Sequence, residues 1–148
     1  MQAALGRIQL WRMADWTRLR RANLERIWAT ARQCPGLRVP KVPEHVGHAG
    51  YKCYVFVKPS KLKASWSRDR IIDEMVSHGV PCFSGSCSEV YREKAFDDSG
   101  WRPKERLPVA CELGETSLMF LIHPTLTDAE MEKTCETLKQ VMSEATET

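Results

Sequence analysis

The stretch from Pro108 to Glu130 constrains the fold most, because its boundary residues define three consecutive elements. Pro108 suits a first helical turn and Gly114 suits the residue just past a helix end, so a short helix is predicted between them. The apolar run 116–122 is too short for a helix with a polar face and predicts a strand buried on both faces. Thr127 and Glu130 then have the spacing of a capping box, which predicts the start of another helix.

Helix and strand signals alternate along the rest of the chain, without repeats or low-complexity linkers. A long helix is predicted first, with Gly6 and Asp15 as the positions where a break would fall. The fold class is therefore α+β: a small, mostly antiparallel sheet of three or four strands covered by helices, whose long first and last helices can pack together. Periodicity leaves the strand order open. The predicted helices cover 1–33, 68–78 and 89–96. Ser67 is expected to cap the second, and a capping box formed by Ser86 and Glu89 is expected to begin the third. The other predicted strands cover 51–57 and 80–83, and an irregular connector covers 39–50.

The overall composition is that of an ordinary globular protein. The chain has 148 residues, of which 43% are hydrophobic and 28% charged, with a formal net charge of +3. No apolar run approaches the ~20 residues that cross a bilayer, and residues 1–10 lack the continuous apolar core of a signal peptide. We therefore expect one domain, a cytoplasmic location and no membrane partner.

The six cysteines do not have the spacing of a zinc site. No Cys-x-x-Cys occurs, and Cys82 and Cys87 are separated by four residues with no histidine between them and no second cysteine pair nearby. Cys53, Cys111 and Cys135 lie in periodic or apolar segments, where a cysteine usually acts as a small buried hydrophobe. We expect reduced thiols and no metal.

Basic residues crowd the first helix, where only Asp15 and Glu25 oppose them. Such a helix with three tryptophans could suggest nucleic acid. However, its arginines do not gather on one face, and its apolar residues occupy several faces. We therefore expect this helix to pack against a domain or subunit on more than one side, and we expect no nucleic-acid partner. The arginines are Arg7, Arg12, Arg18, Arg20, Arg21, Arg26 and Arg32.

Three segments carry a recognisable family pattern. They are Ala4-Leu5-Gly6-Arg7-x-Gln9-Leu10 followed by Arg20-Arg21-Ala22-Asn23, then Tyr51-Lys52-x-Tyr54-Val55-Phe56-Val57, and the block that runs from Leu107 through His123-Pro124-Thr125-Leu126-Thr127. Together they resemble the small C-terminal domain of the DegT/DnrJ/StrS family of pyridoxal-phosphate-dependent sugar aminotransferases. The resemblance extends over residues 4–142.

The resemblance implies a C-terminal domain of a fold-type-I transferase that depends on pyridoxal phosphate (PLP). In that family the Schiff-base lysine and most of the cofactor pocket belong to a large N-terminal domain, which we expect this chain to lack. Residues 1–148 would then form a single domain, with 1–34 as a long linker helix and 35–148 as the small α+β domain. The full-length enzyme is expected to bind PLP, to form a homodimer and to aminate a keto-sugar nucleotide for polysaccharide or cell-surface sugar biosynthesis. No PLP is expected on this chain alone, to which we assign no catalytic residue.

The loop 82–88 leads into the predicted helix 89–96, whose N-terminus would favour a phosphate or carboxylate. A loop that only caps the helix would have the same sequence. The resemblance implies that this loop faces the sugar-nucleotide pocket. Many family members carry a histidine here, where this chain has Ser86 and Cys87. The candidate substrate contacts are Ser84, Ser86, Ser88 and Tyr91.

A second candidate cluster precedes the strand 51–57 and contains His48, Tyr51 and Lys52. A histidine and a lysine close together can bind phosphate or move a proton, although such residues are commonly solvated loop residues. The resemblance places this segment near the mouth of the active site and implies substrate contacts. Lys52 has no phosphate cradle or pyridinium-pairing acid around it in the sequence, which argues against a Schiff-base role.

Two classes of function follow from these patterns. No nucleophile elbow, Walker loop or His-Glu-x-x-His motif is visible. The first hypothesis is the small domain of a sugar aminotransferase, inactive without its large domain. The second is a free-standing interaction or regulatory module that kept the small-domain fold.

Overall fold

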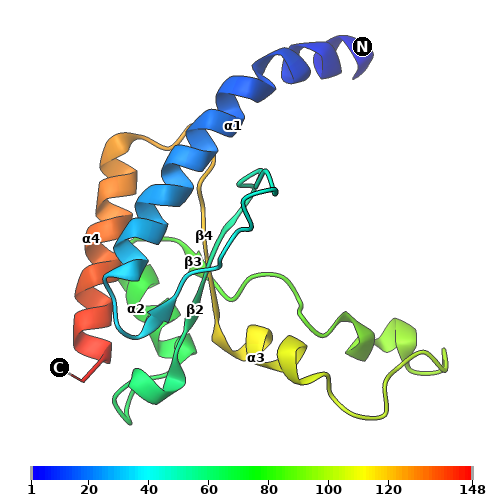
Figure 1. Ribbon diagram of the computed structural model, residues 1–148, viewed down its shortest axis with the longest axis vertical. Helices are drawn as coiled ribbons and strands as arrows, with labels where there is room; N and C mark the ends of the chain where they lie inside the picture. Colours follow the sequence, from blue (N-terminus) through cyan, green and yellow to red (C-terminus); the bar gives the residue numbers. More distant parts are fainter. Residues whose placement is uncertain (1, 148) are drawn as a thin grey trace.

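A four-stranded open sheet organises the protein, whose computed structural model describes residues 2–147 (Figure 1). The strands are β1 (Leu37–Arg38), β2 (Cys53–Val57), β3 (Cys82–Phe83) and β4 (Ser117–Phe120). They lie in the order β1-β2-β4-β3, and each neighbouring pair is antiparallel. The predicted α+β class is confirmed, with the larger of the two predicted strand numbers.

Three helices pack on one face of this sheet. They are α1 (Gln2–Arg32), α2 (Arg68–Ser77) and α4 (Asp128–Ala145), seen together on the left of Figure 1. The core lies between them and the sheet, where Ile27, Ile71 and Phe120 are fully buried. Burial of each such side chain contributes about 1.5–3 kcal/mol. The first and last helices pack together as predicted, and the Arg26 guanidinium lies 2.6 Å from an oxygen of Asp128 at this contact.

Two predicted helix starts are confirmed by their hydrogen bonds. The Thr127 hydroxyl accepts from the N–H of Glu130 at 3.3 Å, and the Glu130 carboxylate accepts from the N–H of Thr127 at 2.7 Å. The Ser67 hydroxyl accepts from the N–H of Arg70 at 3.1 Å. The apolar face of α4 then supplies buried Met131 to the core, so the cap and the hydrophobic pattern agree.

The second face of the sheet is open to the candidate site. Cys53, Val55 and Val57 of β2 point towards the helices and are buried, so Tyr54 and Phe56 point the other way. Tyr54 lies opposite Met119 of β4, and Met119 lies opposite Phe83 of β3. The short helix α3 (Pro108–Thr116) and the loop after β3 lie at this side of the molecule (Figure 1).

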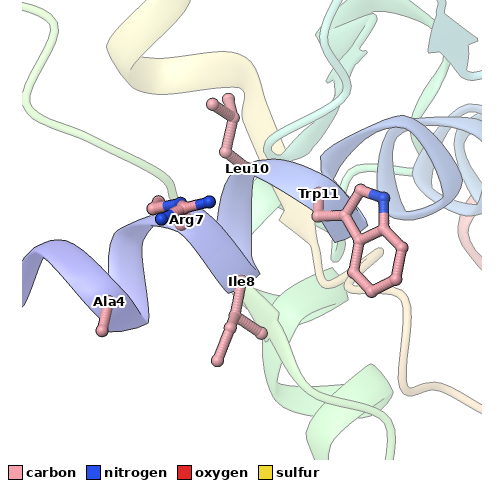
Figure 2. A pocket seen from close by; sticks show the side chains of 5 residues that line it. All are labelled: Ala4, Arg7, Ile8, Leu10 and Trp11. Atoms are coloured by element: carbon pink, nitrogen blue, oxygen red, sulfur yellow. The ribbon is translucent and has the colours of Figure 1, made fainter.

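The N-terminal part of α1 extends away from the sheet, and every residue from 2 to 15 is exposed. The helix is continuous, so neither Gly6 nor Asp15 breaks it, and its first buried residue is Leu24. Trp11 is 88% exposed and Leu10 is 66% exposed. Figure 2 shows Leu10 and Ile8 pointing to opposite sides of the helix, with Trp11 beside them. Apolar residues thus occupy several faces, as predicted from the sequence.

One helix end and one whole helix predicted from the sequence are wrong. Gly114 does not end α3, which continues to Thr116, and a side chain at residue 114 would collide with the hydroxyl of Ser88. The glycine therefore permits close approach rather than a turn. The predicted helix 89–96 is instead two short 3₁₀ turns, η2 (Val90–Arg92) and η3 (Lys94–Phe96), neither with a side-chain cap. A third 3₁₀ turn, η1 (Pro59–Lys61), follows β2.

Candidate functional site

Six of the seven predicted substrate contacts line two neighbouring hollows on the open side of the sheet. The tyrosine hollow, of about 360 Å³, is lined by His48, Ala49, Gly50, Tyr51, Lys52, Tyr54 and Ser86. The serine hollow, of about 300 Å³, is lined by Ser84 to Glu89 with Arg68, Cys111, Gly114 and Glu115. Ser86 belongs to both hollows, so the two clusters predicted separately from the sequence meet at this residue.

The segment that carries His48 is anchored to α1. The Arg21 side chain donates from Nε to the His48 carbonyl at 2.9 Å, and the His48 ring lies 5.7 Å from the Trp28 ring. The N–H of Gly50 donates to Nδ1 of His48 at 3.1 Å. Because Nδ1 accepts this bond, the proton of a neutral His48 lies on Nε2, which is the ring atom left to meet a ligand.

Tyr51 and Lys52 form the exposed rim of the tyrosine hollow. Tyr51 is 75% exposed, and the Lys52 ammonium lies 5.8 Å from the centre of its ring. An exposed aromatic face beside a cation suits a planar ring and an anionic group on the same ligand.

The serine loop, residues 84–88, is held by three contacts, two with strands and one with α3. The Ser117 hydroxyl of β4 donates to the Ser84 carbonyl. Gly85 has φ +92° and packs directly on the Tyr54 ring. Ser88 lies against Gly114 of α3. The loop is therefore held by contacts with strands and α3, and the predicted anion site at a helix N-terminus does not exist because no α-helix follows.

Arg68 fixes the floor of the serine hollow and was missed at the sequence level. It is the first residue of α2, and its side chain is only 17% exposed. Its Nη1 donates to the carbonyls of Gly114 at 3.0 Å and Ser117 at 3.3 Å. A cation at the C-terminal end of α3 is favourable for the unpaired carbonyls there, so Arg68 joins α2, α3 and β4.

Tyr91 lies outside both hollows and stabilises the segment 89–107. Its hydroxyl donates to Glu89 at 2.6 Å and accepts from the N–H of Leu107 at 2.9 Å. Arg106 donates to both oxygens of Glu89. Hydrogen bonds from Arg106 first and Tyr91 second lower the pKa of Glu89 to about 2, while burial and then the bond to Glu89 raise the pKa of Tyr91. With its hydroxyl used twice, Tyr91 closes the base of this segment.

The segment 89–107 projects from the body as an arm (Figure 1). Arg102 donates to the carbonyls of Tyr91, Arg92 and Glu93 and pairs with Asp97, which ties the two sides of the arm together. Trp101 on this arm is 81% exposed.

The residues that line these two hollows do not by themselves fit PLP. Lys52 is the only lysine that lines either hollow, and no aspartate or glutamate lines the tyrosine hollow to pair with a pyridinium nitrogen. Residues 2–147 also hold no group of three histidine, cysteine or acidic side chains arranged for a metal ion. Burial raises the pKa of Cys53 and raises that of Cys82 to about 12, so these thiols are unreactive core residues.

A fold of this class, with a long first helix and a small antiparallel sheet whose open face carries the site, matches a known family of enzymes. The sequence model of the DegT/DnrJ/EryC1/StrS aminotransferase family matches residues 1–139. The chain belongs to this family.

Solved structures define the relation more closely. The aminotransferase from Psychrobacter cryohalolentis is 54% identical with a TM-score of 0.91, over 97% of this chain and 38% of that one. Two more distant relatives show the fold alone. The aminotransferase TlmJ from Streptoalloteichus hindustanus is 22% identical with a TM-score of 0.81, over 96% of this chain and 36% of that one. The sugar aminotransferase CalS13 from Micromonospora echinospora is 14% identical with a TM-score of 0.72, over 88% of this chain and 32% of that one. The chain thus spans about a third of the length of each of these enzymes. No curated protein matches it.

No helix within residues 2–147 is long and apolar enough to cross a membrane.

Proposed function

We propose that this chain is the C-terminal domain of a PLP-dependent aminotransferase and is inactive without a large N-terminal domain. The observation that carries the proposal is its alignment with the Psychrobacter aminotransferase, in which nearly the whole chain matches only 38% of the enzyme at 54% identity. Residues 1–34 would be the linker helix and 35–148 the small domain. PLP would be held by the large domain, where it supplies the carrier for the amino group.

The exposed surface of the chain supports the proposal that a large domain binds to it. The exposed part of α1 and the arm both extend to the same side of the molecule, with the segment before β2 between them (Figure 1). Trp11, Tyr51 and Trp101, the three most exposed aromatic residues, lie on these three segments. Exposed aromatic residues on preformed elements are typical of interfaces. We infer that this side faces the large domain and the second subunit of a homodimer.

A keto-sugar nucleotide is the substrate class that the hollows suit. Tyr51 offers a flat apolar face, Lys52 a cation, and His48 a donor at Nε2, while Ser84, Ser86 and Ser88 line the neighbouring hollow with small polar side chains. Tyr91 is proposed to act indirectly, because its hydroxyl is engaged within the arm. Such an enzyme would act in the cytoplasm and provide amino sugars for polysaccharide or cell-surface sugar biosynthesis.

The second candidate function is a free-standing interaction module with the small-domain fold. The apolar surface of α1 around Leu10 and Trp11 favours it, because such a surface would be the contact site of a partner protein. This module would need no PLP.

One experiment separates the two functions. The complete open reading frame that contains this sequence would be determined and expressed, and its product assayed for transamination of keto-sugar nucleotides with glutamate as amino donor. We expect an in-frame cofactor-binding domain before residue 1 and activity only in the complete product. A complete product that begins at residue 1 and lacks transamination would refute the aminotransferase proposal in favour of the module.

A further inference from the structure

Tyr54 lies beneath the serine loop, at the boundary between the two hollows. We propose that Tyr54 is a positioning residue that presents the Ser86 hydroxyl as a hydrogen-bond donor to an anionic oxygen of the ligand, as on a diphosphate. The inference deepens the proposed function and rests on it for the identity of the natural ligand. In the sequence, Tyr54 belongs to the family pattern at 51–57, and it is not among the predicted substrate contacts.

Tyr54 is held in place by three contacts, one through its backbone and two through its side chain. Its backbone carbonyl accepts from Nε1 of the buried Trp28 at 3.1 Å, which ties β2 to α1 at this residue. Gly85 packs on the Tyr54 ring, and any side chain at residue 85 would collide with the ring carbons. The Tyr54 hydroxyl accepts from the N–H of Ser86 at 3.1 Å. The serine loop is therefore shaped around the Tyr54 ring, and Ser86 cannot shift without breaking this contact.

The hydrogen-bond inventory decides the role of Ser86. A phenol has one proton, and the Tyr54 hydroxyl donates it to Oγ of Ser86 at 3.3 Å while accepting from the backbone of the same residue. The Ser86 oxygen is thus an acceptor towards Tyr54, which leaves its own proton free. Within residues 2–147 no hydrogen bond uses that proton. Ser86, which lines both hollows, is therefore available to a ligand as a donor.

The charge of the tyrosine hollow selects the partner of this donor. Lys52 lines the same hollow, and none of its seven lining residues is acidic. A hydroxyl donor beside an ammonium favours an oxygen that carries negative charge over a neutral one, because hydrogen bonds to charged groups are the stronger class. The geometry thus favours the phosphate oxygens of a nucleotide sugar at this point over the hydroxyl groups of its sugar.

The test is a double-variant cycle on this chain, with uridine diphosphate as the probe and NMR shifts of the backbone amides at positions 52 and 86 as the readout. Tyr54→Phe keeps the ring under Gly85 and removes only the hydroxyl. We expect Tyr54→Phe and Ser86→Ala each to weaken binding about tenfold. Because Tyr54 acts through Ser86, the double variant should bind no more weakly than Ser86→Ala alone.

Three controls make the result decisive. Lys52→Gln combined with Tyr54→Phe should give multiplied losses, because these groups act independently. Ser86→Thr keeps the hydroxyl and should retain the wild-type affinity. In the absence of probe, Tyr54→Phe should accelerate hydrogen exchange at the Ser86 amide while the amides of β4 stay protected, which shows that the fold is intact.

Several outcomes would overturn the proposal. Multiplied losses in the Tyr54 and Ser86 double variant would show that the two residues act separately. Shifts at Ser86 that are absent with uridine diphosphate, or equal with glucose, would refute the anionic ligand. None of these readouts requires transamination, so the aminotransferase proposal and this one fail in separate experiments.

Discussion

Replacing Trp28 by phenylalanine would test how α1 is joined to the sheet. β1 pairs with β2 only at Phe56 and Val57, so the carbonyl of Tyr54 lies beyond the end of β1. Nε1 of Trp28 donates to that carbonyl at 3.1 Å, and the residue is 7% exposed. The indole thus substitutes for a strand that is too short, and phenylalanine removes the donor while keeping an aromatic ring.

Two losses add in this variant. A buried carbonyl without a partner costs about 1–3 kcal/mol, and the smaller ring leaves a void worth about 1 kcal/mol. We therefore expect the free energy of unfolding to fall by about 2–4 kcal/mol, a large part of the 5–15 kcal/mol typical of a domain. The Trp28 ring also contacts the His48 ring, so the segment before β2 should lose order as well.

Urea unfolding followed by far-ultraviolet circular dichroism measures this loss, because the chain holds five tryptophans and their fluorescence is not specific to one site. With a slope of about 1–3 kcal/mol per molar urea, the midpoint should fall by about 1–2 M. Trp11→Phe is the matched control, since Trp11 is 88% exposed and its replacement should change stability by less than about 0.5 kcal/mol. Equal midpoints for the two variants would refute the reasoning.

Four further outcomes are expected. Treatment of the isolated chain with PLP and borohydride should label no single lysine stoichiometrically, and such labelling at Lys52 would overturn the domain assignment. Sedimentation should show concentration-dependent association through α1 that Leu10→Arg reduces; a strictly monomeric wild-type chain with Leu10 and Trp11 protected from amide exchange would contradict this. Thr127→Ala should lower stability by about 1 kcal/mol through loss of the cap, read from the thermal midpoint, and an unchanged midpoint would show that the cap is dispensable. Glu89 has a folded-state pKa of about 2 against an ordinary 4.5, so its stabilisation is complete above about pH 4.5 and is lost as the pH falls towards 2; a Glu89→Gln variant with the same acid dependence as the wild type would exclude this source.

The two capping-box patterns show what local sequence can and cannot specify. After Thr127 the helical face continues with Met131, which is buried, so cap and core agree. After Ser86 no buried residue follows over 90–96, and Glu89 binds Arg106 rather than the helix end. A cap without an apolar face does not sustain an α-helix, because packing supplies most of helical stability. The pattern was therefore sufficient for α4 and insufficient for residues 89–96.

The candidate site follows a similar division. His48, Tyr51 and Lys52 were predicted together and line one hollow, and Ser86 joins them from a loop distant in sequence. That meeting depends on the antiparallel pairing of β3 with β4 and β4 with β2, which periodicity does not specify. The face on which Tyr54 lies could have been predicted from the sequence, because side chains alternate along a strand and Tyr54 follows the buried Cys53.

The long first helix gives the molecule a lever. From Gln2 to Asn23 it rises about 33 Å without a buried residue, since burial begins at Leu24. A rotation of the sheet by about 10° would then displace the tip of α1 by about 6 Å, while the hollows near its base would move far less. Small changes of angle at the ligand are thereby converted into large translations at the far end of the helix. We therefore expect a domain bound to the N-terminal end of α1 to move when a ligand near Ser86 changes the angle of the sheet.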